Sequence, residues 1–155
     1  MTNTFKFIVS VGTCFLVAAL GSIVTTPSIS TWYAALEKPF FNPPNWIFGP
    51  VWSLLYLMMG ISLYLVWSKK STSTVRHAIT IFGIQLLVNF LWSFVFFYLH
   101  QPLLAFITIL VLWSAILYTI TIFKPISKPA SYLLVPYLLW VSFASILNVF
   151  IMLLN

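Results

Sequence analysis

Acidic side chains are almost absent from this sequence. Among 155 residues there is no aspartate, Glu37 is the single carboxylate, and charged residues of both signs make up only 5%. Soluble domains have roughly a quarter of their residues charged, whereas this chain is 62% hydrophobic with a mean hydropathy of +1.08. A chain of this composition cannot form a soluble surface, so the sequence predicts an integral membrane protein.

Residues that bind metals or perform acid–base catalysis are equally scarce. Cys14 is the only cysteine, which excludes an intrachain disulfide. A zinc site needs clustered His, Cys or carboxylate ligands, but the two histidines, His77 and His100, are predicted to lie at opposite faces of the membrane. Either histidine alone could be an axial haem ligand. We therefore expect no catalytic residues, no metal site and no bound cofactor.

Five apolar stretches are long enough to cross a bilayer, which takes about 20 residues of helix. None contains a charged side chain, and strands of a membrane barrel would be shorter and alternating. The sequence therefore predicts an all-α membrane protein, a single domain over residues 1–155 made of five transmembrane helices. The predicted helices are residues 7–26, 46–67, 78–99, 103–123 and 132–154.

The first stretch has an alternative interpretation. Lys6, an apolar run and the small residues Val17-Ala18-Ala19 also resemble a secretory signal with a cleavage site. The apolar run continues to Val24, which is longer than such signals usually are, and this favours a retained helix.

The basic residues predict how the chain is oriented. They stand singly or in pairs between apolar runs and form no basic patch, so the net charge of +6 does not indicate nucleic-acid binding. Loops on the cytoplasmic side are enriched in Lys and Arg. We therefore expect a multi-pass protein of the cell membrane with its N-terminus cytoplasmic and its C-terminus extracytoplasmic. This topology puts six basic residues inside, Lys6, Lys69, Lys70, Arg76, Lys124 and Lys128, and only Lys38 outside.

The first loop, residues 27–45, is long, rich in proline and rich in aromatic residues. Proline fixes φ and removes a hydrogen-bond donor, so the loop cannot be one regular helix. A stiff aromatic loop on the outer side is typical of a lid over the bundle. Trp and Tyr also collect at membrane interfaces without any lid, and the loop by itself favours neither interpretation.

Three of the predicted helices carry polar, small and tryptophan residues at helical spacing, which predicts inward stripes. Such stripes occur in ordinary helix packing and also in aromatic-walled pockets that bind flat conjugated ligands. Spacing alone leaves both interpretations open. The stripes are Trp52, Tyr56 and Gly60; Gln85, Asn89, Trp92 and Phe96; and Pro136, Trp140, Ala144 and Asn148.

Three ordered motifs closely resemble those of the translocator protein family, also called tryptophan-rich sensory proteins or peripheral-type benzodiazepine receptors. The resemblance covers the chain from Trp32 onward. The first motif is Trp32-Tyr33 … Leu36-Glu37-Lys38-Pro39-Phe40-Phe41-Asn42-Pro43-Pro44-Asn45-Trp46-Ile47-Phe48-Gly49-Pro50-Val51-Trp52 … Leu55-Tyr56 … Met59-Gly60. The other two are Gln85 … Asn89 … Trp92 … Phe96-Phe97 and Pro136-Tyr137 … Trp140 … Phe143-Ala144 … Leu147-Asn148.

The resemblance implies a five-helix bundle, often a homodimer, that binds porphyrins such as protoporphyrin IX and haem beneath the first loop. The fifth helix ends without the Tyr and basic residue of the cholesterol motif proposed for animal members, so we expect no dedicated sterol site and a bacterial member. The ligand-binding residues that the resemblance implies are Trp32, Pro43, Pro44, Trp52, Tyr56, Asn89, Trp92, Trp140, Ala144 and Asn148.

The leading hypothesis is therefore a membrane receptor or sensor that binds porphyrins and similar flat hydrophobic molecules. An alternative is an enzyme that degrades protoporphyrin in light with tryptophan as electron donor, since no acid–base pair is available. A further alternative is a tetrapyrrole transporter, which the lack of internal repeats and of charges within the membrane disfavours.

Overall fold

The computed structural model describes residues 2–155, and every regular element within them is helical. Five helical segments are long and apolar enough to cross a membrane, so the predicted five-helix membrane bundle is confirmed. Two of the segments are each formed by two consecutive helices. The elements are α1 (Asn3–Ile29), α2 (Trp32–Ala35), α3 (Asn45–Trp67), α4 (Ser73–Ser93), the π-helix η1 (Phe94–Tyr98), α5 (Pro102–Phe123), α6 (Lys128–Leu133) and α7 (Val135–Leu154).

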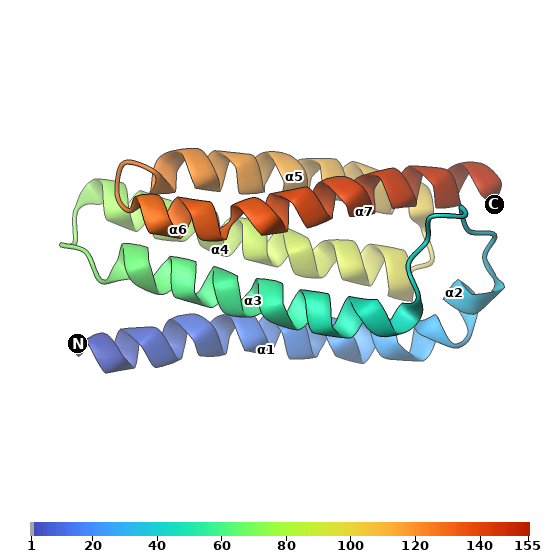
Figure 1. Cartoon of the computed structure of the whole chain (residues 1–155), viewed down its shortest axis with the longest axis horizontal. Helices are drawn as coiled ribbons and strands as arrows, with labels where there is room; N and C mark the ends of the chain where they lie inside the picture. The colour runs from blue at the N-terminus through green and yellow to red at the C-terminus, as the bar shows by residue number, and fades with distance from the viewer. Residues whose placement is uncertain (1) are drawn as a thin grey trace.

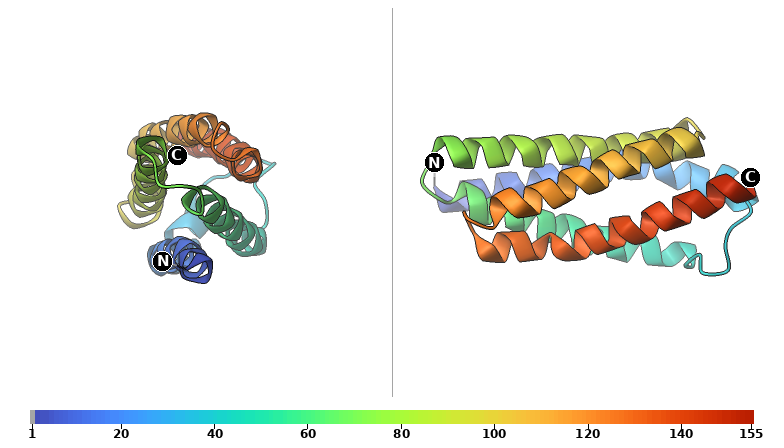
Figure 2. Two further views of the ribbon diagram at one scale, coloured as in Figure 1. Left: turned by 90° about the vertical axis from the view of Figure 1, so that its left-hand side faces the viewer. Right: turned by 90° about the horizontal axis from the view of Figure 1, so that it is seen from above.

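The long helices lie side by side, with the two termini at opposite ends of the bundle (Figure 1). Seen end-on they form a ring in which α1 lies between α3 and α4, and α5 lies between α4 and α7 (Figure 2). The ring is closed where α6 packs against α3, and there the Ser62 hydroxyl donates to the Ala130 carbonyl at 2.7 Å.

Helix α1 is longer than the predicted residues 7–26 at both ends. It starts early because the Thr2 hydroxyl caps it by accepting from the Phe5 amide. Lys6 is tolerated near the start because its amine donates to the Trp67 carbonyl at the end of α3, at 2.9 Å. Pro27 lies within the last turn, and the helix ends at Ile29.

The third membrane segment changes its helical form. It begins at Ser73, five residues before the predicted start, because Thr72 caps it through the Val75 amide. From Phe94 to Tyr98 the helix widens into a π-helix, a form that often occurs at functional sites. His100 then adopts φ 55°, the left-handed region, and turns the chain sharply into α5.

The last segment also starts earlier than the predicted residue 132. The Ser127 hydroxyl accepts from the Ala130 amide and starts α6 at Lys128. The helix is interrupted at Leu134, two residues before Pro136, because a proline inside a helix has no amide to donate and clashes with the preceding turn. Helix α7 then continues to Leu154.

Helices α1 and α3 are packed closely at one level and leave space at another. A Cβ on Gly60 would lie 2.7 Å from the Cα of Val11, so only glycine fits there. Toward the α2 end, Ser22 lies eleven residues after Val11 in α1, and Gly49 lies eleven residues before Gly60 in α3. A Cβ on Gly49 would meet no atom within 4 Å.

The loop between α1 and α3 crosses the end of the bundle and reaches α7 (Figure 1). Phe41 packs against Phe143 and Phe150 of α7, with ring centroids 6.4 and 5.2 Å apart. Phe40, in contrast, is fully exposed at 101%. The loop thus combines a part packed on the bundle with exposed aromatics of the kind found at interfaces.

Candidate functional site

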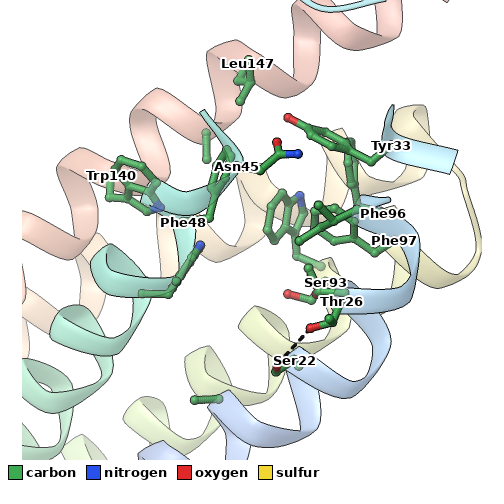
Figure 3. Close-up of a pocket in the computed structure, with 18 of the residues that line it drawn as sticks. Ser22, Thr26, Tyr33, Asn45, Phe48, Ser93, Phe96, Phe97, Trp140 and Leu147 are labelled. Carbon is green, nitrogen blue, oxygen red and sulfur yellow. Dashed lines mark hydrogen bonds between the residues drawn. The ribbon is translucent and has the colours of Figure 1, made fainter. Parts of the chain in front are cut away.

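A cavity of about 250 Å³ lies inside the half of the bundle nearest α2. Its walls come from the C-terminal part of α1, the N-terminal part of α3, the junction of α4 with η1, and the C-terminal part of α7. Tyr33 of α2 lies at its outer end (Figure 3). The cavity therefore lies beneath the first loop, the position that the family resemblance implied.

The structure brings six of the ten sequence-predicted site residues to the cavity wall. The other four do not line it: Pro43 and Pro44 stand in the loop before α3, Trp32 lies on α2 beside the cavity, and Asn89 is buried one turn deeper. The six lining residues are Trp52, Tyr56, Trp92, Trp140, Ala144 and Asn148.

Eight aromatic side chains line the cavity, and they come from α2, α3, α4, η1 and α7. Trp92 and Phe96, from α4 and η1, stack with ring centroids 5.7 Å apart and planes 24° from parallel. Across the cavity, Phe48 of α3 meets Trp140 of α7 edge-on at 6.1 Å (Figure 3). A concave apolar wall of this kind suits flat conjugated molecules, which stack on aromatic faces.

A chain of buried hydrogen bonds holds Tyr56 in the cavity wall. The Tyr56 hydroxyl donates to Asn89 Oδ1 at 2.6 Å, and Asn89 Nδ2 donates to the Tyr137 hydroxyl at 2.6 Å. The Tyr137 hydroxyl donates in turn to Gln85 Oε1 at 3.1 Å. Asn89 thereby acts on the cavity through Tyr56, and the network joins α3, α4 and α7.

Asn148 serves as a second polar link between helices. Its Oδ1 accepts from Trp92 Nε1 at 3.2 Å, and its Nδ2 donates to the Pro102 carbonyl at 2.9 Å. These bonds fix the indole of Trp92 at the cavity wall and tie α7 to the end of α4 and the start of α5. Such bonds are typical of polar residues buried in membrane bundles.

The outer end of the cavity is closed by Tyr33, whose side chain is 3% exposed. Its hydroxyl donates to Asn42 Oδ1 at 2.7 Å, and the Lys38 amine lies 4.9 Å from its ring centroid. Burial raises the pKa of Tyr33 from its ordinary 10.0 to about 12, and the hydrogen bond with Asn42 offsets part of this rise. Tyr33 therefore remains a neutral, hydrogen-bonded part of the wall at physiological pH.

Trp32 contacts the neighbouring elements and not the cavity. Its indole stacks on the His100 ring, with centroids 4.4 Å apart and planes 20° from parallel. It also packs against Phe96, whose ring lines the cavity, with centroids 5.4 Å apart and planes at 72°. This arrangement attaches α2 to the turn that follows η1.

The prediction that Pro136 shares an inward stripe with Trp140 is wrong, because Pro136 is exposed. Residues four apart drift by about 40° per step around a 3.6-residue helix, so three such steps turn through about 120°. The next residue, Tyr137, faces the interior instead and joins the polar network.

The contribution of α1 to the cavity was not predicted, because no inward stripe had been assigned to this helix. Gly21, Ser22, Thr25 and Thr26 all line the cavity. Their spacing of three to four residues on one helical face was the signal that could have revealed them.

None of the residues that line the cavity is charged. Within residues 2–155, no three His, Cys, Asp or Glu side chains are grouped so that they could hold a metal ion. The cavity thus offers a ligand its shape, aromatic faces and neutral hydrogen-bonding groups.

Comparison with known proteins agrees with this architecture. The model of the TspO/MBR family matches residues 10–154. The tryptophan-rich protein TspO of Archaeoglobus fulgidus is 46% identical over 153 residues, covering 99% of each chain. The human translocator protein is 38% identical over 120 residues, which are 76% of this chain and 70% of the human one. A tryptophan-rich sensory protein of Cereibacter sphaeroides is 33% identical over 141 residues, 89% of this chain and 87% of its own. The family resemblance is thus confirmed: this multi-pass membrane protein belongs to the TspO/MBR family.

Proposed function

We propose that this protein is a membrane receptor or sensor that binds porphyrins and similar flat hydrophobic molecules in the cavity beneath its first loop. The observation that carries the proposal is the convergence of Trp52, Trp92 and Trp140 on one uncharged cavity. The indole faces supply large apolar areas for stacking on a conjugated ring. The names of its relatives, which include a sensory protein and translocator proteins, are in keeping with such a role.

The cavity volume bears on how a porphyrin would be held. Small-molecule sites usually enclose roughly 300–1,000 Å³, and this cavity encloses about 250 Å³. A tetrapyrrole would therefore be only partly enclosed unless the cavity widened. Tyr33 closes the outer end through its hydrogen bond to Asn42 and its ring contacts with Phe96 and Phe97. Widening at this end therefore requires the first loop to move away from η1.

Titration of the purified protein in nanodiscs with protoporphyrin IX in the dark, followed by tryptophan fluorescence, tests the proposal. We expect saturable quenching that becomes weaker in Trp140→Ala, because this indole forms part of the cavity wall. Trp46→Ala is the matched control, since Trp46 is 74% exposed and lies outside the cavity. If folded Trp140→Ala protein binds protoporphyrin IX with unchanged affinity, this cavity is not the porphyrin-binding site.

Illumination of the same samples separates binding from turnover. A receptor or sensor leaves the extracted pigment intact after exposure to light. Bleaching that requires both light and Trp52 or Trp140 would instead favour the photodegrading enzyme. If quenching by protoporphyrin IX never saturates, the porphyrin assignment itself fails.

A further inference from the structure

One wall of the cavity differs in chemistry from the rest. Ser22 and Thr26 of α1 and Ser93 of α4 stand together there, opposite Phe48 and Trp140 (Figure 3). The Ser22 and Thr26 hydroxyls are 3.2 Å apart and hydrogen-bonded to each other. The cavity therefore has an aromatic side and a hydroxyl side.

The hydrogen bonding of these three hydroxyls differs from that of other hydroxyls in the bundle. Hydroxyls within helices commonly bond back to the carbonyl one turn earlier. Thr108 does so to Leu104 at 2.8 Å, and Ser114 does so to Leu110 at 2.9 Å. Ser22 and Thr26 bond to each other instead, and the Ser93 hydroxyl makes no hydrogen bond among residues 2–155.

The hydroxyl wall therefore has unused donors. A single bond between Ser22 and Thr26 uses only one of their two hydroxyl hydrogens, because each hydroxyl has one hydrogen to donate. The other hydrogen, and that of Ser93, are free to point into the cavity. A ligand atom with a lone pair would satisfy them.

The hydroxyl wall also adjoins the opening of the cavity. The lining residues that are exposed all come from α1 and α3, so the cavity opens between these helices. The open space beside Gly49 lies on this side. Ser22 is seven residues from the end of α1, about 10 Å at 1.5 Å per residue, which puts the opening close to the membrane surface.

The absence of charge in the wall selects the kind of polar group that fits. An ionised carboxylate is costly to bury without a cation or a full set of hydrogen bonds. Neutral hydroxyls instead suit an uncharged acceptor, such as the carbonyl of an ester, an amide or a protonated carboxyl group.

We infer that Ser22, Thr26 and Ser93 form a hydrogen-bonding subsite that receives uncharged carbonyl substituents of a flat ligand whose ring lies against the aromatic side. The inference rests on the proposed function, since it assigns the orientation of a ligand in the same cavity. It makes these three residues determinants of specificity and not of general affinity for porphyrins.

Three porphyrins compared on one triple variant test the subsite. The variant is Ser22→Ala/Thr26→Val/Ser93→Ala, and the probes are protoporphyrin IX, its dimethyl ester and octaethylporphyrin, which carries only alkyl groups. Dissociation constants are measured in nanodiscs by tryptophan quenching. Thr108→Val is the control, because it removes a hydroxyl of α5 that bonds to its own helix outside the cavity.

We expect the triple variant to bind the dimethyl ester roughly tenfold more weakly, the loss appropriate to one or two neutral hydrogen bonds. Its affinity for octaethylporphyrin should stay within about twofold, and Thr108→Val should resemble the native protein with all probes. If the triple variant binds the ester and octaethylporphyrin equally more weakly, or binds both as the native protein does, the inference of a hydroxyl subsite is wrong while the proposed function stands. If the native protein binds none of the three, the proposed function itself fails.

Discussion

The hydroxyl of Tyr56 donates a 2.6 Å hydrogen bond to Asn89 Oδ1, and through it the cavity wall is joined to the polar centre of the bundle. Both side chains are buried, at 6% and 1% exposure. Tyr56 contacts the cavity, whereas Asn89 does not. Substitution of Asn89 should therefore alter the cavity by displacing the Tyr56 side chain.

Replacing Tyr56 with Phe should destabilise the bundle by about 1 kcal/mol, because the buried Asn89 Oδ1 loses its donor. The thermal midpoint in detergent should fall accordingly. Tyr98→Phe is the control, since that residue is 62% exposed and its hydroxyl has no hydrogen bond within residues 2–155. Equal midpoints for the two variants would mean that the bond adds nothing to stability.

Two glycines of α3 should respond in opposite ways to alanine. Gly60→Ala places a Cβ 2.7 Å from the Val11 backbone and should cost about 1–3 kcal/mol, because one of the helices must move. Gly49→Ala meets open space and should be neutral or stabilising by up to about 1 kcal/mol through better helix propensity. Thermal unfolding of both variants in the same lipid checks this, and similar midpoints would contradict the close contact at Gly60.

Alkaline pH should release the first loop from the bundle. The pKa of Tyr33 is about 12 in the folded protein and 10.0 ordinarily, so the folded state binds the phenol proton more tightly. The stability that comes from this burial is complete below pH 10 and is lost as the pH rises toward 12. Limited proteolysis of the loop should therefore increase over this range. In Tyr33→Phe, which has no proton to lose, an unchanged pH profile would show that another group is responsible.

Single cysteines should report the orientation of the chain in the membrane. Cys14 is fully buried and gives little background, while Phe40 and Ser71 are exposed at opposite ends of the bundle. With a membrane-impermeant maleimide on intact cells, Phe40→Cys should react and Ser71→Cys should react only after permeabilisation. The reverse pattern would invert the predicted topology, in which the basic loops are cytoplasmic.

Hydropathy predicted the number of membrane helices correctly and placed residues 46–67 and 103–123 to within one residue of α3 and α5, but it put the starts of the other three too late. The predicted starts followed the limits of the apolar runs, whereas the real starts follow local capping by Thr2, Thr72 and Ser127. A charged residue also need not end a helix. Lys6 remains inside α1 because its flexible stem lets the amine reach the end of the bundle.

Helical spacing predicted which face a residue occupies, but not its depth or its partner. Asn89 and Trp92 share a face of α4, yet only Trp92 lines the cavity, because Asn89 lies one turn away and is taken up by Tyr56 and Tyr137. Those partners come from other helices, and no pattern within one segment reveals them. The small and hydroxylated residues of α1 are a different case, because their own spacing on one helical face was a signal within the segment.

The close contact between Val11 and Gly60 also has a mechanical consequence. Where two helix backbones touch, the helices cannot move closer together, but one can still tilt relative to the other. A tilt of α1 against α3 would therefore turn about the contact between Val11 and Gly60. Ser22 lies about 16 Å along the lever arm, and a tilt of about 10° would carry it through about 3 Å. A small rotation of α1 would thus widen the opening between α1 and α3 beside Gly49 without disturbing the rest of the bundle. A bulkier residue at position 60 would move the point about which the helix rotates.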